Sequence, residues 1–96
     1  MICLHDIRRR RNDILAVARR NGAYDVHIFG SVARGQADTA SDLDLLVRFE
    51  PNRTLFDHGE LVLDLQDLLG VSVDVLDADG LRPRFREQVM KEAAPL

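Results

Sequence analysis

The run from Asp42 to Phe49 alternates apolar residues with other residues, and this alternation constrains the fold more than any other feature of the chain. Successive side chains of a β-strand point to opposite faces of a sheet. The apolar members of the run therefore share one face: Leu43, Leu45, Val47 and Phe49. Asp42 and Asp44 fall on the other face. The pattern predicts a strand over 43–49 that buries one face and presents two carboxylates on the other.

Apolar periodicity and turn residues predict the remaining elements. They are a helix over 5–21, a strand over 26–30, a helical turn over 32–35, a helix over 55–69, a strand over 71–76 and a helix over 84–93. This order predicts one small mixed α/β (α+β) domain over residues 1–96, with helices packed on one face of the sheet. The other face stays open, and the carboxylates point to it.

A third carboxylate, Asp74, lies within the apolar run from Val71 to Leu76 and faces away from its valines. Two carboxylates about 4 Å apart repel by roughly 4 kcal/mol at an effective dielectric constant of 20. A fold that brings Asp42, Asp44 and Asp74 together therefore requires a divalent cation. Because all the ligands are oxygens, Mg²⁺ is the expected ion.

A Gly30-Ser31 pair ends the strand predicted over 26–30, and ten residues separate it from Asp42. Glycine lets the backbone approach a phosphate closely, and a helix that starts there aims N–H groups at the anion. Taken alone, a Gly-Ser turn is more often only a turn. The glycine spacing also resembles a P-loop, but Gln36-Ala37 replaces the required Lys-Ser/Thr, which excludes that motif. Magnesium carboxylates beside a phosphate-binding turn favour phosphoryl or nucleotidyl transfer.

Composition and charge exclude several classes of protein. No apolar run is long enough to span a bilayer, and charged residues follow Leu4 at once, so neither a membrane span nor a secretory leader is expected. The net charge is −3, with basic ends around an acidic middle, which argues against direct nucleic-acid binding. The single Cys3 cannot form an internal disulfide, so a cytoplasmic protein is expected. The Arg8–Arg11 run predicts either a solvated helix face or a contact with an acidic partner.

The string Gly30-Ser31-x-Ala-Arg34-Gly, followed by Ser41-Asp42-x-Asp44-Leu, resembles the signature of the DNA polymerase β-like nucleotidyltransferase superfamily. The fuller string is typical of its smallest branch, the minimal nucleotidyltransferase (MNT) proteins. The resemblance covers essentially the whole chain and includes a third acid in a later strand. It implies the nucleotidyltransferase fold, with the active site on the open face of the sheet.

The resemblance also implies a metal centre with ATP as the substrate. Asp42 and Asp44 would hold two Mg²⁺ ions that bridge the triphosphate. Asp74 would complete the metal site and help to deprotonate the attacking hydroxyl.

Nucleotide binding is implied for the turn and for the loop that follows it. Gly30 and Ser31 would bind the β- and γ-phosphates. Arg34 would lie near the phosphates, with a surface ion pair as the alternative. Ser41 would either contact the nucleotide or cap the loop before Asp42.

Larger members of the superfamily add a helical domain that holds the acceptor, whereas only about twenty residues follow Asp74 here. We therefore expect a protein partner to present the hydroxyl. The resemblance implies a HEPN-domain toxin, an all-α RNase, with AMP transferred to one of its tyrosines. The chain would then act as an antitoxin and form a hetero-oligomer. Two alternatives are a non-catalytic module that neutralises its partner by occlusion, and nucleotidyl transfer to a small molecule.

Overall fold

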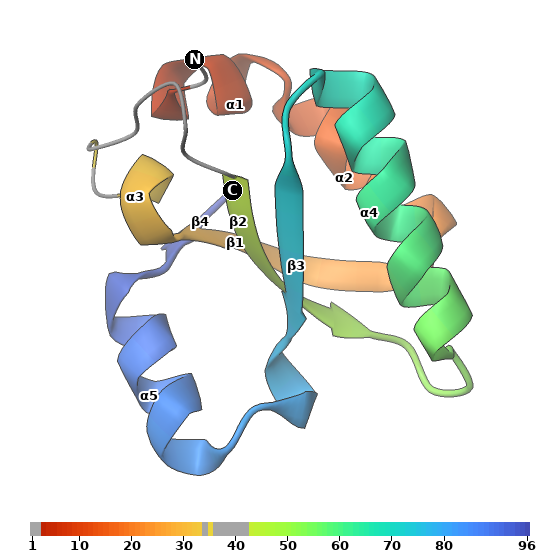
Figure 1. The fold of residues 1–96 in the computed structure, drawn as a ribbon, viewed down its shortest axis with the longest axis vertical. Helices are drawn as coiled ribbons and strands as arrows, with labels where there is room; N and C mark the ends of the chain where they lie inside the picture. The colour runs from red at the N-terminus through yellow and green to blue at the C-terminus, as the bar shows by residue number, and fades with distance from the viewer. Residues whose placement is uncertain (1–2, 34, 36–42) are drawn as a thin grey trace.

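The computed structural model describes residues 3–33, 35 and 43–96, with only the backbone of Ser31. It contains a four-stranded mixed sheet with the strand order β3-β2-β1-β4 (Figure 1). The strands are β1 (Ala23–Phe29), β2 (Leu43–Phe49), β3 (Val73–Asp77) and β4 (Ala94–Pro95). β1 runs antiparallel to β2 and β4, while β2 and β3 run parallel. The strand predicted over 43–49 therefore occupies the middle of the sheet.

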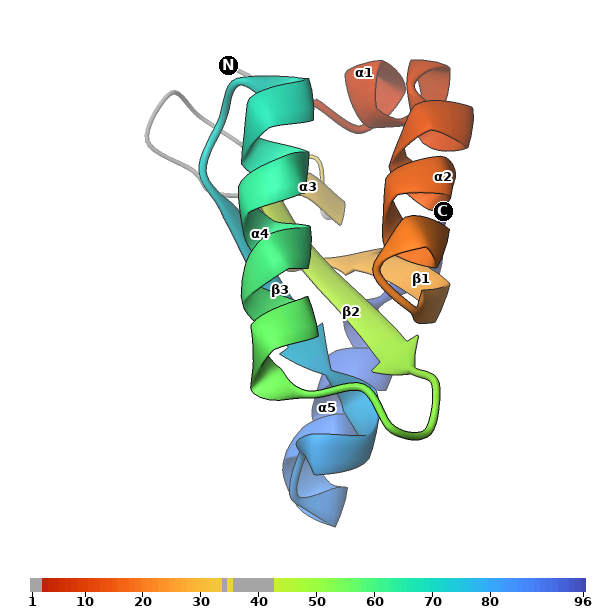
Figure 2. The same cartoon turned by 90° about the vertical axis from the view of Figure 1, so that its right-hand side faces the viewer.

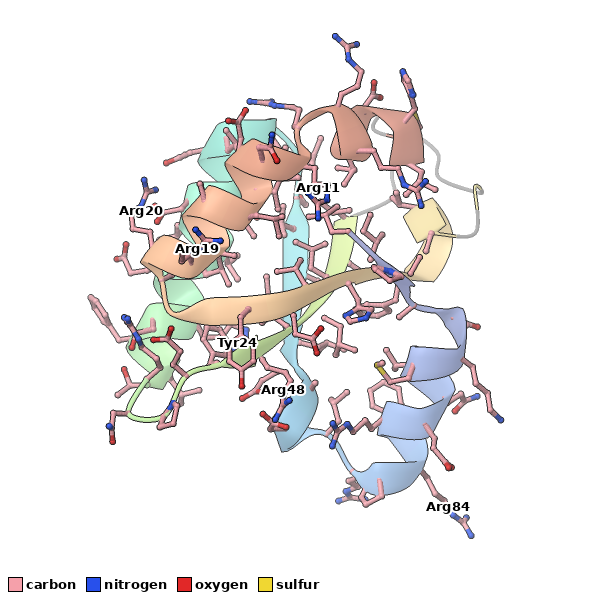
Figure 3. The ribbon with its side chains drawn as sticks, turned by 180° about the vertical axis from the view of Figure 1, so that it is seen from behind. Arg11, Arg19, Arg20, Tyr24, Arg48 and Arg84 are labelled. Atoms are coloured by element: carbon pink, nitrogen blue, oxygen red, sulfur yellow. The ribbon has the colours of Figure 1, made fainter. Side chains whose placement is uncertain are left out.

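The helices bracket these strands in the predicted order. They are α1 (Leu4–Arg9), α2 (Arg11–Arg20), α3 (Gly30–Ala33), α4 (Leu55–Leu69), the 3₁₀ helix η1 (Ala78–Gly80) and α5 (Pro83–Glu92). The helix predicted over 5–21 is thus two helices, with Arg10 at φ −103° and ψ 17° between them. Arg11 interrupts the apolar stripe of this segment. The Nε atom of Arg11 donates to the carbonyl oxygen of Leu96 at 2.8 Å, so its side chain reaches the C-terminal end of the chain (Figure 3).

Local capping fixes both ends of α4, the longest helix. The Thr54 hydroxyl accepts from the Phe56 N–H at 3.2 Å, and the Asp57 carboxylate accepts from the Thr54 N–H at 2.9 Å. Gly70 ends the helix at φ 69°, a left-handed conformation that glycine adopts without strain. The bounds predicted for this helix, 55–69, are confirmed.

Helices α1, α2 and α4 cover one face of the sheet and enclose the main core (Figure 2). Their inward residues are almost fully buried against the apolar face of β2. The most buried members are Ile7, Ile14, Leu43, Leu45, Val47, Leu61 and Leu65. The Asn21 Nδ2 group ties α2 to α4 by donating to the Asp64 Oδ2 atom at 3.0 Å. The predicted fold class is confirmed, but the prediction that the helices all pack on one face is wrong for α5, which packs on the other face.

The opposite face of the sheet carries a smaller apolar cluster, in which Leu46 packs with Ala78 of η1 and Val89 of α5. Helix α5 lies on this side, away from α2 and α4 (Figures 1 and 2). This face is therefore covered around Leu46 and is more open near the first residues of β2. Within the part of the chain that the structure describes, no helix is long and apolar enough to cross a membrane.

Candidate active site

Asp44 occupies the second position of the central strand and has a register partner on each side. It pairs with Phe29 of β1 and with Asp74 of β3. Directly opposed residues share a face of the sheet, and neighbouring strands lie about 4.8 Å apart. Phe29, Asp44 and Asp74 therefore form a row across three strands. Two carboxylates that are 30 positions apart in the sequence lie next to one another.

The chemistry of this carboxylate pair fits a divalent cation. Asp44 is half-buried and Asp74 is exposed, so the pair is open to solvent on one side. Carboxylate oxygens suit Mg²⁺, and a bound cation would offset the repulsion between adjacent like charges. The described residues alone do not bring three potential metal ligands together. Asp42, the third predicted carboxylate on the strand, lies outside the described residues, as do Ser41 and Arg34.

Gly30 brings the Gly-Ser turn directly against Asp44. It follows the last residue of β1, begins α3, and has a φ of 75°. A Cβ atom at this position would overlap the Asp44 Oδ2 atom and lie 3.2 Å from its Cγ atom. Glycine is therefore required here both for its left-handed backbone and for the close approach. The turn and the carboxylate pair belong to one site.

Two other acids, one at the end of β3 and one in η1, have structural partners. The Arg48 Nε–H donates to the Asp79 carboxylate at 3.2 Å, and this hydrogen bond raises the pKa of the Arg48 guanidinium. Arg48 also lies over the Tyr24 ring, 5.6 Å from its centroid (Figure 3). The Asp77 carboxylate accepts from the Asp79 N–H at 3.0 Å and so caps η1. These contacts account for both acids without a metal.

His58 also has a structural place. Its Nε2 atom lies 2.7 Å from the carbonyl oxygen of Val75, and its ring lies 5.4 Å from the Phe49 ring, centroid to centroid. The histidine thereby connects α4 to the sheet on the face opposite the carboxylates.

Sequence reasoning missed the residues of α5 that border the site. A pocket beside Gly30 is lined by Phe29, Gly30, Phe85, Gln88, Val89 and Glu92. The four-residue spacing of Phe85 and Val89 places them on one side of a helix, which is a visible signal. This spacing does not reveal which face of the sheet α5 covers, and the pocket forms only because α5 packs on the face that carries Asp44.

Comparison with known proteins finds similar sequences that are named nucleotidyltransferases or protein adenylyltransferases. Residues 12–95 match the family described as nucleotidyltransferase domain. A protein of Methanocaldococcus jannaschii, named as a candidate protein adenylyltransferase, is 32% identical over 90 residues, which is 94% of each chain. Protein adenylyltransferase MntA of Thermococcus cleftensis is 37% identical over 73 residues, covering 76% of this chain and 74% of that protein.

Solved structures share the fold. One described as a candidate minimal nucleotidyltransferase is 55% identical, with a TM-score of 0.89, covering 99% of this chain and 97% of the other. A toxin–antitoxin structure with AMP-PNP is 24% identical, with a TM-score of 0.77, covering 88% of this chain and 69% of the other. A complex of tri-AMPylated HEPN toxin from Shewanella oneidensis with its MNT antitoxin is 21% identical, with a TM-score of 0.70, covering 92% and 69%.

At their low identity, the two toxin–antitoxin structures support the fold alone. The family match over residues 12–95 and the 32% identity over 94% of the chain go further. They show that this protein belongs to the nucleotidyltransferase domain family.

Proposed function

We propose that this protein transfers AMP from ATP to a tyrosine hydroxyl of a HEPN-domain toxin, and so acts as its antitoxin. The observation that carries the proposal is the pairing of Asp44 with Asp74 beside Gly30. The relatives named protein adenylyltransferase support the reaction. The structures that share this fold include one with an AMPylated HEPN toxin and one with AMP-PNP, and the proposal takes its partner and its nucleotide from them.

The metal site of the proposal consists of Asp42, Asp44 and Asp74, which would hold two Mg²⁺ ions. Bound Mg²⁺ would neutralise the triphosphate and stabilise the charge that develops during phosphoryl transfer. The row of Asp44 and Asp74 supplies the reason for this assignment, because two adjacent carboxylates bind a divalent cation better than either does alone.

Nucleotide binding is assigned to the turn and to the loop that leads into β2. Gly30 and Ser31 would bind the β- and γ-phosphates through the backbone N–H groups at the start of α3. Arg34 and Ser41 would add contacts to the phosphates. The close approach of Gly30 to Asp44 supports this assignment, since it keeps the polyphosphate adjacent to the carboxylates.

The chemical step is a single displacement at the α-phosphorus. The acceptor hydroxyl oxygen forms a bond to this phosphorus as the bond to the oxygen that bridges the α- and β-phosphates breaks. Pyrophosphate leaves with the electron pair, and the hydroxyl proton passes to the carboxylate of Asp74. We propose that residues 1–96 act as one catalytic domain in the cytoplasm, where ATP is available, and that the toxin presents the hydroxyl.

The test is a labelling reaction with the purified protein, the HEPN toxin, Mg²⁺ and ATP. We expect label on the toxin when it is carried on the α-phosphate and none when it is carried on the γ-phosphate. Label from the γ-phosphate, or no label at all, would contradict AMP transfer.

The variant Asp44→Asn separates catalysis from occlusion. We expect it to fold and bind the toxin but to leave the toxin unlabelled and active. If this variant still neutralises the toxin, inhibition is by occlusion alone. A parallel reaction with an aminoglycoside in place of the toxin tests transfer to a small molecule, for which we expect no product.

A further inference from the structure

A pocket of about 330 Å³ shares a wall with the candidate site and lies beside α5. Its lining includes Phe29, the register partner of Asp44, and Gly30, which packs against the Asp44 carboxylate. From α5 come Phe85 and Gln88. We propose that this pocket binds the purine base of the nucleoside triphosphate, with Phe85 stacking on the ring. The inference rests on the proposed function, because it assumes that the same site takes ATP.

The lining suits a neutral ring rather than a phosphate. Phe29, Phe85 and Val89 provide apolar surface, and no lysine or arginine is among the described residues that line the pocket. A polyphosphate placed here would lose water without gaining a cation. Phe85 is 49% exposed although it is large and aromatic. A base that stacks on such a side chain gains affinity whatever its sequence identity, because every base has a π-face.

The position of the pocket assigns it to the nucleotide rather than to the acceptor. In the sheet order, β2 lies between β3, which carries Asp74, and β1, which leads into Gly30. In phosphoryl transfer the attacking and leaving oxygens are roughly in line. A hydroxyl that gives its proton to Asp74 approaches over β3. The pocket lies on the other side of Asp44, next to the turn that would bind the phosphates.

Gln88 provides a polar group that can read the edge of the ring. It is exposed and lines the pocket, and the described residues include no hydrogen-bond partner for its amide. A glutamine amide can accept from the N6 amino group of adenine while it donates to N7. The sequence alone leaves the choice of nucleotide open, and this residue favours adenine.

The test compares two ligands that differ by the nucleoside, MgATP and magnesium tripolyphosphate, by calorimetric titration of the full chain. We expect Phe85→Ala to raise the Kd for MgATP about tenfold. The Kd for tripolyphosphate should stay unchanged, because this ligand has no base. Gln88→Ala should weaken MgATP binding by a smaller factor and also leave tripolyphosphate binding unchanged.

Phe56→Ala is the matched control, since Phe56 is 75% exposed on α4, which packs on the opposite face of the sheet. It should bind both ligands as the parent protein does. All three variants should keep the thermal unfolding midpoint of the parent within a few degrees, so a loss of affinity is not a loss of fold.

Three outcomes would overturn the assignment. Phe85→Ala could bind MgATP with unchanged affinity, or it could bind both ligands more weakly by the same factor. In the labelling reaction, it could raise only the KM for the toxin, which would assign the pocket to the acceptor. In each of these cases the proposed function would still stand, provided that the parent protein transfers AMP normally. If the parent protein binds neither ligand, the proposed function itself fails.

Discussion

Alternate residues of β2 form its two faces, and these faces differ in their burial and their chemistry. Leu43, Leu45 and Val47 are 0–1% exposed beneath α1, α2 and α4. Asp44, between two of them, faces the other side, where it pairs with Asp74 and contacts Gly30. The core face holds the larger apolar core, and we propose that the face with Asp44 carries the chemistry. Two neighbouring strands can therefore hold a pair of carboxylates close together, because the opposite face of the sheet is tightly packed.

The largest expected effect is the loss of AMP transfer when Asp44, on the face with the carboxylate pair, is substituted. Asp44→Asn keeps the shape of the side chain but removes its charge. We expect AMP transfer to fall about 1000-fold or more, which corresponds to roughly 4 kcal/mol of transition-state stabilisation. The free energy of unfolding should change by less than about 1 kcal/mol, because Asp44 is half-buried and belongs to neither apolar cluster. Urea unfolding monitored by circular dichroism, together with initial rates of labelling, measures both quantities.

Changing the packed face should give the opposite result. Leu65 is 1% exposed between α4 and the sheet, so Leu65→Ala should lower the free energy of unfolding by about 2–5 kcal/mol. The rate of AMP transfer per folded molecule should stay near the parent value. Leu63→Ala is the matched control on the same helix, since Leu63 is 58% exposed, and its effect should stay within about 0.5 kcal/mol. Equal destabilisation by both variants would contradict the packing described here.

Gly30→Ala tests the contact that joins the turn to the carboxylates. The left-handed backbone alone costs an alanine about 1–2 kcal/mol, and its Cβ would also displace the Asp44 carboxylate. Gly35 is the matched control, because its φ is 70° but nothing lies within 4 Å of an added Cβ atom. Both variants should lose similar stability, and only Gly30→Ala should also raise the Kd for MgATP. If the two variants affect nucleotide binding equally, the contact has no functional role.

The smallest expected effect is on the way the free energy of unfolding depends on pH through Asp57, in the first turn of α4. The backbone N–H of Thr54 holds the pKa of Asp57 below its ordinary value, and Arg53 acts in the same direction. A carboxylate with a lowered pKa in the folded state stabilises the fold above its unfolded-state pKa, and this contribution is lost as the pH falls through the folded-state pKa. Asp57→Asn should therefore be less stable than the parent near pH 7, with the difference shrinking in acid. Urea titrations at a series of pH values measure it, and a difference that grows in acid would contradict the assignment.

Patterns that are local in the sequence predicted the fold well. The strand over 43–49 and the helix over 55–69 were predicted with their observed bounds, because alternation and capping act over a few residues. The two-residue strand β4 has no such pattern and was missed. The break at Arg10 was also missed, since apolar periodicity on both sides of it reads as one helix.

The candidate site was only partly accessible to sequence reasoning, for a physical reason. Alternation predicted which face Asp44 and Asp74 occupy, but the parallel register that sets them side by side depends on packing between distant segments. The placement of α5, and with it the pocket that includes Phe85, depends on packing in the same way. The roles of all the site residues stay predictions. The structure places Gly30, Asp44 and Asp74 together, whereas Ser31 is described only by its backbone and Asp42, Arg34 and Ser41 lie outside the described residues.

The Mg²⁺ dependence of AMP transfer in two acid variants of the β3 region tests most directly whether the row across β2 and β3 is the metal site. Asp74 lies in that row, whereas Asp79, a few residues later, pairs with Arg48. Asp74→Asn should raise the Mg²⁺ concentration for half-maximal activity about tenfold or more, or abolish activity, and Asp79→Asn should leave it at the parent value. The same Mg²⁺ requirement in both variants would show that Asp74 does not hold the metal.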